Sequence, residues 1–332
     1  MSAFLLVISF AVILAGALLF TNAVEWLGHR LELGEGAVGS LLAAVGTAMP
    51  ETLIAIVALV GGAEGADDVA IGAIVGAPFL LATLAMGLVG LFAYLYRRRR
   101  RQGIELRAHV PTLDRDLAFF LAFFSLGLAL GWGAPAELRI PVGVAFFASY
   151  AVYIWRTLLR GGEVQAEETL NPLIMERRRG RRELPAALPL AILQFLVGLG
   201  AMVGGAHLFV EELLHVAEDI GVEALVLALI LAPLATELPE KVNSFFWVRE
   251  GKDSLALGNI TGAMVFQSTI PVGIGLIFTD WELSTNAMVS IGLGLTGGVL
   301  AYWALRLRGR FDLAPVIAWF VLYAAFIVVV AV

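Results

Sequence analysis

Two glutamates, each directly preceded by a proline, interrupt apolar stretches of the sequence. Glu51 lies in "GTAMPETLIAIV", and Glu240 lies in "LATELPEKVNS". Proline cannot donate a hydrogen bond to the carbonyl four residues earlier, so each helix would carry a freed backbone oxygen beside a carboxylate. Carboxylates, carbonyls and hydroxyls together form an all-oxygen set, which suits a hard cation such as Ca²⁺.

Each motif offers the same further oxygens. A threonine stands four residues before each glutamate and shares its helix face, and the freed carbonyl belongs to the residue five positions before it. The predicted cation ligands of the two motifs are Glu51, Thr47 and Gly46 in the first, and Glu240, Thr236 and Ala235 in the second.

The two motifs belong to an internal repeat. The pattern Thr-x-x-Pro-Glu recurs after 189 residues, and so does "GALLF" of 16–20, which matches "GAHLF" of 205–209. A second set recurs after 186 residues: Asp67, Gly72 and Gly76 match Asp253, Gly258 and Gly262. The glycines have the spacing of close helix packing. The three aspartates Asp67, Asp68 and Asp253 lie at predicted helix starts, where capping accounts for them.

Composition indicates an integral membrane protein. The mean hydropathy is +0.89 and only 15% of the residues are charged, against about a quarter in soluble domains. With no cysteine, disulfides and thiolate metal sites are excluded. Apolar segments of spanning length, about 20 residues, recur along the chain. The ten predicted helices are 3–24, 36–60, 68–95, 116–133, 138–159, 186–213, 222–247, 254–278, 284–305 and 313–332.

The positive charges predict the orientation. All but two of the 22 Lys and Arg residues fall on one side if both termini lie outside, the exceptions being Arg139 outside and Lys241 within the membrane. Arginine runs such as 97–101 therefore serve cytoplasmic topology and anionic-lipid contact, and no nucleic-acid partner is expected. We expect a multi-pass protein of the cell inner (plasma) membrane, with inorganic cations and lipids as partners and a monomer as a plausible state.

These features predict an all-α integral membrane protein of ten transmembrane helices. Five predicted helices separate equivalent positions, and because five is odd the second copy must be inverted relative to the first. The predicted units are a first five-helix repeat, 1–160, a cytoplasmic linker, 161–185, and a second, inverted repeat, 186–332. The first helix lacks a basic region before it and is expected to be retained, and the linker has the composition of a solvated loop.

The sequence resembles the calcium/cation antiporter superfamily, which includes sodium/calcium exchangers. The family's first repeat reads approximately G-T-S-x-P-E followed by G-N-x-x-G-S-N, where this chain has "GTAMPE" and "GAIVGAPFLL". Its second repeat is similar, where this chain has "ATELPE" and "GNITGAMVFQ". The resemblance implies that Glu51 and Glu240 coordinate Ca²⁺, that Thr47 and Thr236 contribute backbone oxygens, and that Asn259 lines the site.

The departures from the family pattern bear on whether Na⁺ is the counter-ion. Family serines correspond to Ala48, Ala77, Glu237 and Ala263, and the family's later Asn and Asp ligands correspond to Leu81 and Gln267. Glu237 lies one turn before Glu240 and could supply a third carboxylate. Three carboxylates in a dry site favour proton exchange, because they cannot all stay ionised without a cation. We therefore expect exchange of Ca²⁺ for H⁺, ahead of exchange for Na⁺, with no cofactor.

Three alternatives remain at this point. The first is a Na⁺/H⁺ exchanger on the same scaffold, and the second is a passive cation channel, which uses similar oxygen ligands but shows no obligatory exchange. The third and most remote is an intramembrane metallopeptidase built on "EELLH" of 211–215, whose acids and histidine have helical spacing. That stretch occurs once and lacks a second histidine at the spacing a zinc site needs.

Overall fold

The computed structural model describes most of the chain. The described residues are 1–30, 43–107, 109–133, 135–159, 172–176, 188–308 and 310–331. Within these ranges, the side chains of 25, 28–30, 43–47, 158–159, 238–243 and 331 lie outside the described part. The predicted helix 36–60 and the predicted linker 161–185 therefore lie partly outside the described residues. The side chains of Thr47, Glu240 and Lys241 lie wholly outside them.

The described chain is helical, apart from one isolated antiparallel bridge between Leu106 and Phe311. In the first half the elements are α1 (Ser2–Arg30), α3 (Ala43–Gly61), α4 (Ala66–Leu80), the π-helical turn η2 (Leu81–Ala85), α5 (Met86–Leu95), α6 (Val110–Gly131), the 3₁₀ turn η3 (Ala136–Leu138) and α7 (Arg139–Leu159). In the second half they are α8 (Leu188–Ile220), α9 (Ala224–Glu250), α10 (Asp253–Gln267), α11 (Ile270–Phe278), α12 (Thr285–Arg308) and α13 (Leu313–Ala331).

Each of the ten predicted segments contains a helix or a consecutive set of helices. Within the described residues, seven segments are long and apolar enough to cross a membrane, and the motif helices α3 and α9 hold shorter apolar stretches, 48–61 and 224–237. The protein is therefore an all-α protein with several membrane-spanning candidates. The ten crossings and the inversion of the second repeat stay predictions.

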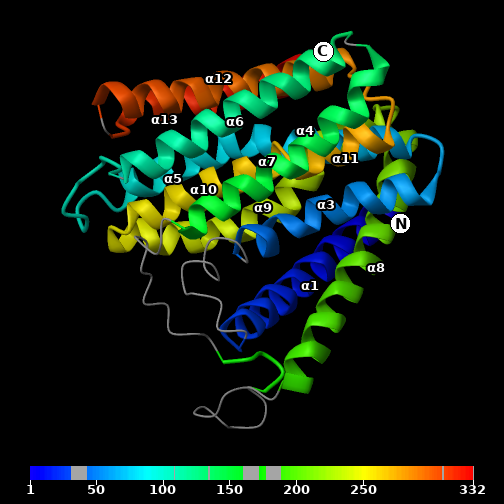
Figure 1. The fold of residues 1–332 in the computed structure, drawn as a ribbon, viewed down its shortest axis with the longest axis horizontal. Helices are drawn as coiled ribbons and strands as arrows, with labels where there is room; N and C mark the ends of the chain where they lie inside the picture. The colour runs from blue at the N-terminus through cyan, green and yellow to red at the C-terminus, as the bar shows by residue number, and fades with distance from the viewer. Residues whose placement is uncertain are drawn as a thin grey trace.

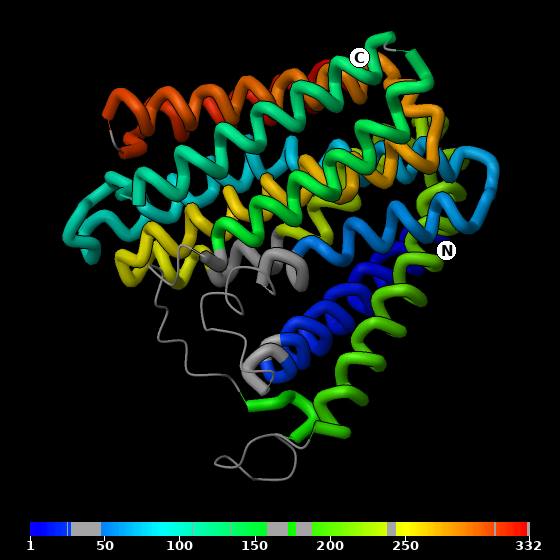
Figure 2. Tube along the Cα trace, in the orientation of Figure 1, coloured from blue at the N-terminus to red at the C-terminus, as the bar shows by residue number. Residues whose placement is uncertain are grey.

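The helices run roughly along one common direction. Figure 1 shows α12, α13 and α6 on one side of the bundle, α3, α4, α9 and α10 through its middle, and α1 and α8 as a tilted pair on the other side. Both chain termini lie at the same end of the bundle, and the turn between α3 and α4 lies there too (Figure 2). The stretch after α5 lies at the opposite end.

Glycines let the paired helices approach closely. A Cβ added to Gly16 of α1 would stand 2.9 Å from the carbonyl oxygen of Gly198 on α8, and a Cβ on Gly198 would stand 2.9 Å from that of Gly16. On α4, a Cβ on Gly76 would stand 2.6 Å from the oxygen of Leu229 on α9. The predicted close packing is therefore confirmed for Gly72 and Gly76, whereas Gly258 and Gly262 have no described atom within 4 Å of an added Cβ.

The second helix of each repeat motif is interrupted at an equivalent place. In the first copy, α4 continues into α5 through the π-helical turn, which begins at Leu81. In the second copy, α10 ends at Gln267, and α11 begins at Ile270 after a two-residue turn. Leu81 and Gln267 are 186 residues apart, which is the repeat separation. The interruption therefore recurs in different form, and hydropathy alone did not predict it.

Part of the linker packs against α1 and α8. The backbone N–H of Ile174 donates to Asn22 Oδ1 at 3.0 Å, and that of Met175 donates to Gln194 Oε1 at 2.9 Å. Leu173, 1% exposed, packs beside Trp26. Residues 172–176 are thus partly packed and partly exposed, because two buried amides on α1 and α8 accept hydrogen bonds from the backbone of the segment while Ile174 remains exposed.

Candidate cation site

Three helices bring buried polar side chains to the middle of the bundle. Glu51 on α3 is 2% exposed, Glu237 on α9 is 1% exposed, and Gln267 at the end of α10 is fully buried. Ala48 of α3 packs in one cluster with Val265 and Phe266, the residues just before Gln267. Carboxylates are costly inside a membrane and mark functional places there.

The motif helix α3 keeps its helical path through Pro50. The proline has no N–H to give to the oxygen of Gly46, so the chain carries one freed carbonyl a turn before Glu51. Thr52 does not face away to solvent: its hydroxyl donates to the oxygen of Ala48 at 2.9 Å, and its side chain is buried. The helix therefore presents Glu51 from a region whose other described side chains are apolar or bonded to the backbone.

The second motif helix, α9, is more polar. Thr236 is buried, and its hydroxyl donates to the oxygen of Ala232 at 2.8 Å. One turn further back, Pro233 leaves the oxygen of Leu229 without its helical donor, and this is the oxygen that Gly76 of α4 approaches. The close packing of α4 on α9 therefore lies directly over the proline-weakened turn, next to the site.

Glu237 and Gln267 form the direct link between α9 and α10. The side-chain amide of Gln267 donates to Glu237 Oε1. Gln267 Oε1 is buried and takes no hydrogen bond from the described part of the chain. An amide that donates with one atom to a carboxylate leaves its oxygen as a neutral cation ligand. The pair thus offers one charged and one uncharged oxygen group from neighbouring helices.

Two side-chain hydroxyls form hydrogen bonds to the backbone at the helix break after Gln267. Thr269 donates to the oxygen of Val265 at 2.7 Å, and Ser268 lies within 3.2 Å of the same oxygen. The equivalent Thr83 donates to the oxygen of Phe79 at 2.7 Å. Helix ends leave carbonyls without backbone partners, so these hydroxyls stabilise the interruption in both copies.

The remaining predicted ligands divide into two groups. Ala235 and Asn259 are both half-buried, on α9 and α10. The side chains of Thr47 and Glu240 lie outside the described part, and Gly46 is described only as part of the helix α3. Among the described residues, no group of three His, Cys, Asp or Glu could hold a metal ion. The pairing of Glu51 with Glu240 therefore stays a prediction.

Sequence reasoning missed Asp116. This carboxylate on α6 is 2% exposed and accepts hydrogen bonds from Tyr153 of α7 at 2.8 Å and from Thr261 of α10 at 3.0 Å. The neighbouring Arg115 also bonds it, at 2.9 Å. It ties α10 to two helices of the first half. Because the predicted helix began at 116, Asp116 was placed at a helix end. Pro111, a residue typical of a first helical turn, marks the true start of α6.

Sequence reasoning also misassigned Arg100 and Asp253. We expected capping to account for Asp253, but its carboxylate makes no cap and binds the Arg100 guanidinium, with both side chains at most 1% exposed. Arg100 is the buried member of a run that we assigned to cytoplasmic topology, while Arg98, Arg99 and Arg101 are exposed. A run of five arginines does not reveal which one is buried.

The "EELLH" stretch forms no metal site in the structure. Glu212 and His215 are 3.9 Å apart on α8, at helical spacing, and Glu211 is exposed. No third His, Cys, Asp or Glu in the described part of the chain joins this pair in a group that could hold a metal ion.

A sequence model described as "Sodium/calcium exchanger protein" matches residues 1–159 and 190–332. The chain belongs to this family. As a member of the sodium/calcium exchanger protein family, it is a multi-pass membrane transporter and not an enzyme. The resemblance recognised in the sequence is thereby confirmed, and the metallopeptidase alternative is set aside.

Two curated relatives are similar along most of their length. "Putative antiporter CaxA" of Alkalimonas amylolytica is 22% identical over 87% of this chain and 84% of its own. "Sodium/calcium exchanger MaX1" of Methanosarcina acetivorans is 22% identical over 91% of this chain and 92% of its own. The likeness therefore extends across both halves.

Solved structures share the fold. The H⁺/Ca²⁺ exchanger CAX aligns with a TM-score of 0.74 at 19% identity, over 98% of this chain and 82% of that one. The sodium-calcium exchanger NCX_Mj aligns with a TM-score of 0.62 at 18% identity, over 98% of both chains. At such identities the likeness concerns the fold alone, which both kinds of exchanger have in common.

Proposed function

We propose that the protein is a secondary active antiporter that exports Ca²⁺, or a similar divalent cation, in exchange for H⁺ or Na⁺. In this proposal the cation binds at a midplane site built on Glu51 and Glu240, and access alternates between two inverted five-helix repeats. Both termini lie outside the plasma membrane. Membership in an exchanger family supports antiport over a passive channel, because exchangers couple two fluxes.

The observation that supports the proposal is that three mutually packed helices, α3, α9 and α10, carry Glu51, Glu237 and Gln267, each at 2% exposure or less. A carboxylate buried without a cation or proton is unfavourable in a low-dielectric interior. Buried oxygen groups on three packed helices therefore form a place where a hard cation is favoured. The bond from Gln267 fixes one oxygen of the Glu237 carboxylate between α9 and α10.

The counter-ion that we favour is H⁺. The first copy carries Ala48 where the family has a serine, and the second carries Glu237 at the matching place. A hydroxyl suited to Na⁺ is thus absent from one position, and a carboxylate occupies the other. An extra carboxylate attracts a second positive charge, and a proton satisfies that need without further ligands.

The experiment is ⁴⁵Ca²⁺ flux in proteoliposomes under an imposed pH gradient or an imposed Na⁺ gradient. We expect uptake to follow the pH gradient and to require counterflow. A flux that follows Na⁺ and ignores pH would make Na⁺ the counter-ion. Na⁺ flux driven by pH without any Ca²⁺ movement would favour the Na⁺/H⁺ exchanger, and Ca²⁺ flux without obligatory exchange would favour a channel.

The site is tested with Glu51→Gln and Glu240→Gln, each of which should abolish exchange. The matched control is Glu212→Gln, which neutralises another mostly buried carboxylate, on α8 and outside the motifs. This control should leave the choice of counter-ion unchanged. Normal Ca²⁺ flux in both motif variants would refute the site, whatever ion drives transport. Competition by Mn²⁺ and Mg²⁺ then ranks the divalent cations.

A further inference from the structure

One end of the bundle is held by a buried ion pair between the two halves of the chain. Arg100, which follows α5, donates to both carboxylate oxygens of Asp253 at the start of α10, at 2.7 and 2.9 Å. Both side chains are essentially inaccessible. A bidentate arginine–carboxylate pair is strong and directional, and its burial removes the screening that weakens surface pairs.

Several further bonds fix this pair, which we call the Arg100 clasp. Arg100 also donates to the backbone oxygens of Gly103 and Glu105, at 2.9 and 2.8 Å, and to that of Val248 near the end of α9. The backbone N–H of Arg107 donates to Asp253 at 2.9 Å. The clasp therefore ties the stretch after α5 to the turn between α9 and α10, the helices that carry Glu237 and Gln267.

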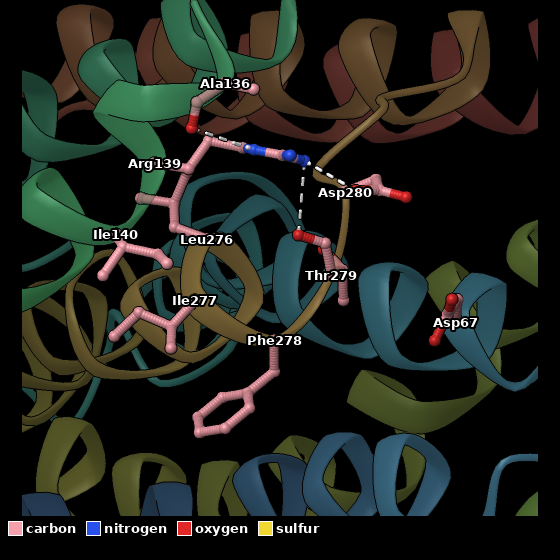
Figure 3. A pocket seen from close by; sticks show the side chains of 9 residues that line it. All are labelled: Asp67, Ala136, Arg139, Ile140, Leu276, Ile277, Phe278, Thr279 and Asp280. Atoms are coloured by element: carbon pink, nitrogen blue, oxygen red, sulfur yellow. Dashed lines mark hydrogen bonds and ion pairs between the residues drawn. The ribbon is translucent and has the colours of Figure 1, made fainter.

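The repeat supplies the matching position at the opposite end of the bundle. Asp67 lies 186 residues before Asp253, in the first turn of α4, but its side chain is exposed. A cavity of about 290 Å³ lies beside it, lined also by Arg139 of α7 and by residues 276–280, the last turn of α11 and the two residues after it. Figure 3 shows the Arg139 guanidinium turned to Thr279 and Asp280, while Asp67 stands apart on α4.

Each end of the bundle also carries an ion pair between the two halves of the chain. Arg139, the first residue of α7, pairs with Asp280, between α11 and α12, at 3.1 Å. At the other end, Arg310, between α12 and α13, pairs with Glu105, between α5 and α6, at 2.9 Å. Each end therefore has one such ion pair. What differs is that Asp253 is clasped by an arginine, whereas Asp67 faces a cavity.

We propose that the Arg100 clasp is the latch that keeps one end of the transport path closed while the Asp67 end is open, and that it releases when access alternates. Arg100 and Asp253 are then positioning residues that set the balance between the two access states. The latch rests on the proposed antiport, since a channel needs no alternation. Removing one partner leaves the other charge buried and alone, which the chain relieves by opening that end.

Thiol labelling tests the latch, because the chain contains no cysteine and each introduced thiol reports without background. Ala256→Cys places a reporter in the fully buried interior one turn beyond Asp253, and Ala136→Cys places one on the wall of the cavity at the Asp67 end. In the full chain in proteoliposomes, the second thiol should react quickly with a water-soluble maleimide and the first slowly.

Arg100→Gln should change the two reporters in opposite directions. We expect labelling at position 256 to speed up about tenfold and labelling at position 136 to slow down, because the equilibrium moves toward the state open at the Arg100 end. Asp253→Asn should give the same pattern. Arg99→Gln, a change to the exposed neighbour, is the control and should alter neither rate.

Two outcomes would overturn the latch. Faster labelling at both positions would mean that the clasp only stabilises the fold, and unchanged labelling at both would mean that it sets no balance between the two access states.

The labelling rates do not depend on Ca²⁺ flux. Opposite changes in the reporters together with normal flux in Glu51→Gln and Glu240→Gln would therefore keep the latch and refute the cation site, so the two failures are distinguishable.

Discussion

In the first copy of the sequence repeat, Glu51 is accompanied by the apolar residues Ala48 on α3 and Leu81 at η2, both fully buried. In the second copy, the positions matching Ala48 and Leu81 are Glu237 and Gln267, which are bonded to each other. The backbone plan is repeated, while the polar chemistry is concentrated in α9 and α10. A repeated scaffold can thus carry an asymmetric site, in which the first copy supplies Glu51 and the second supplies the bonded pair of Glu237 and Gln267.

The largest effect should come from making the second copy resemble the first. Glu237→Ala installs the residue that the first copy has at the matching Ala48. Loss of a buried charge that contacts a cation costs about 3 kcal/mol, so Ca²⁺ affinity should fall about 100-fold. Equilibrium ⁴⁵Ca²⁺ binding to the purified protein measures this, with Glu212→Ala as the control. Unchanged affinity would mean that the asymmetry of the two copies does not concern the ion.

The next effect concerns packing. Gly76→Ala should destabilise the protein by about 2–3 kcal/mol, because the new Cβ would stand 2.6 Å from the oxygen of Leu229. The matching Gly262→Ala meets no described atom within 4 Å and should be neutral or slightly stabilising, since alanine favours a helix over glycine. Chemical unfolding in detergent compares them. An equal loss in both would show that the copies pack alike.

A smaller effect should follow from Gln267→Leu. This change keeps the bulk of the side chain but removes the donor to Glu237, which is worth about 2 kcal/mol for a bond to a charged group. We expect Ca²⁺ affinity to fall by about tenfold, with Gln102→Leu, on the stretch after α5, as the control. If the variant bound Ca²⁺ with the wild-type affinity, the bond between Gln267 and Glu237 would have no role in cation binding.

The smallest effects concern stability and compare the helix break after α10 with the π-helical turn η2. Thr269→Val removes the hydroxyl that bonds Val265 at a true helix break, and should cost about 1–1.5 kcal/mol of stability. Thr83→Val removes the matching bond inside a π-helical turn, where the helix continues on both sides, and should cost about 0.5 kcal/mol. Thermal unfolding measures both, and the reverse order would show that the π-helical turn is the weaker point.

Helix positions followed from hydropathy because lipid and a packed interior both select apolar residues over a spanning length. The motif residues Glu51 and Thr236 were predicted from their recurrence, and both are buried. The bond between Gln267 and Glu237 could not be predicted from the sequence, because it joins residues 30 positions apart where two helices cross. Recurrence indicates which positions matter but not which atoms meet.

The missed residues share one physical cause. Arg100 and Asp116 are charged, and charge near a helix end normally indicates solvent. Each is buried because a partner from a distant part of the chain satisfies it: Asp253 for Arg100, and Thr261 with Tyr153 for Asp116. Composition cannot distinguish a solvated charge from a buried, satisfied one. Only the folded arrangement shows the partner.

The cavity at the Asp67 end is adjacent to a tryptophan that could serve as an optical probe. Trp281 follows Asp280, and its positive φ of 47° is rare outside glycine. Its indole N–H donates to the oxygen of Gly127 on α6 at 2.9 Å, and its ring lies against Gly275. This indole, 2% exposed, borders a segment that lines the cavity. Once the other six tryptophans are replaced by phenylalanine, its emission wavelength should thus respond to hydration there without an added dye.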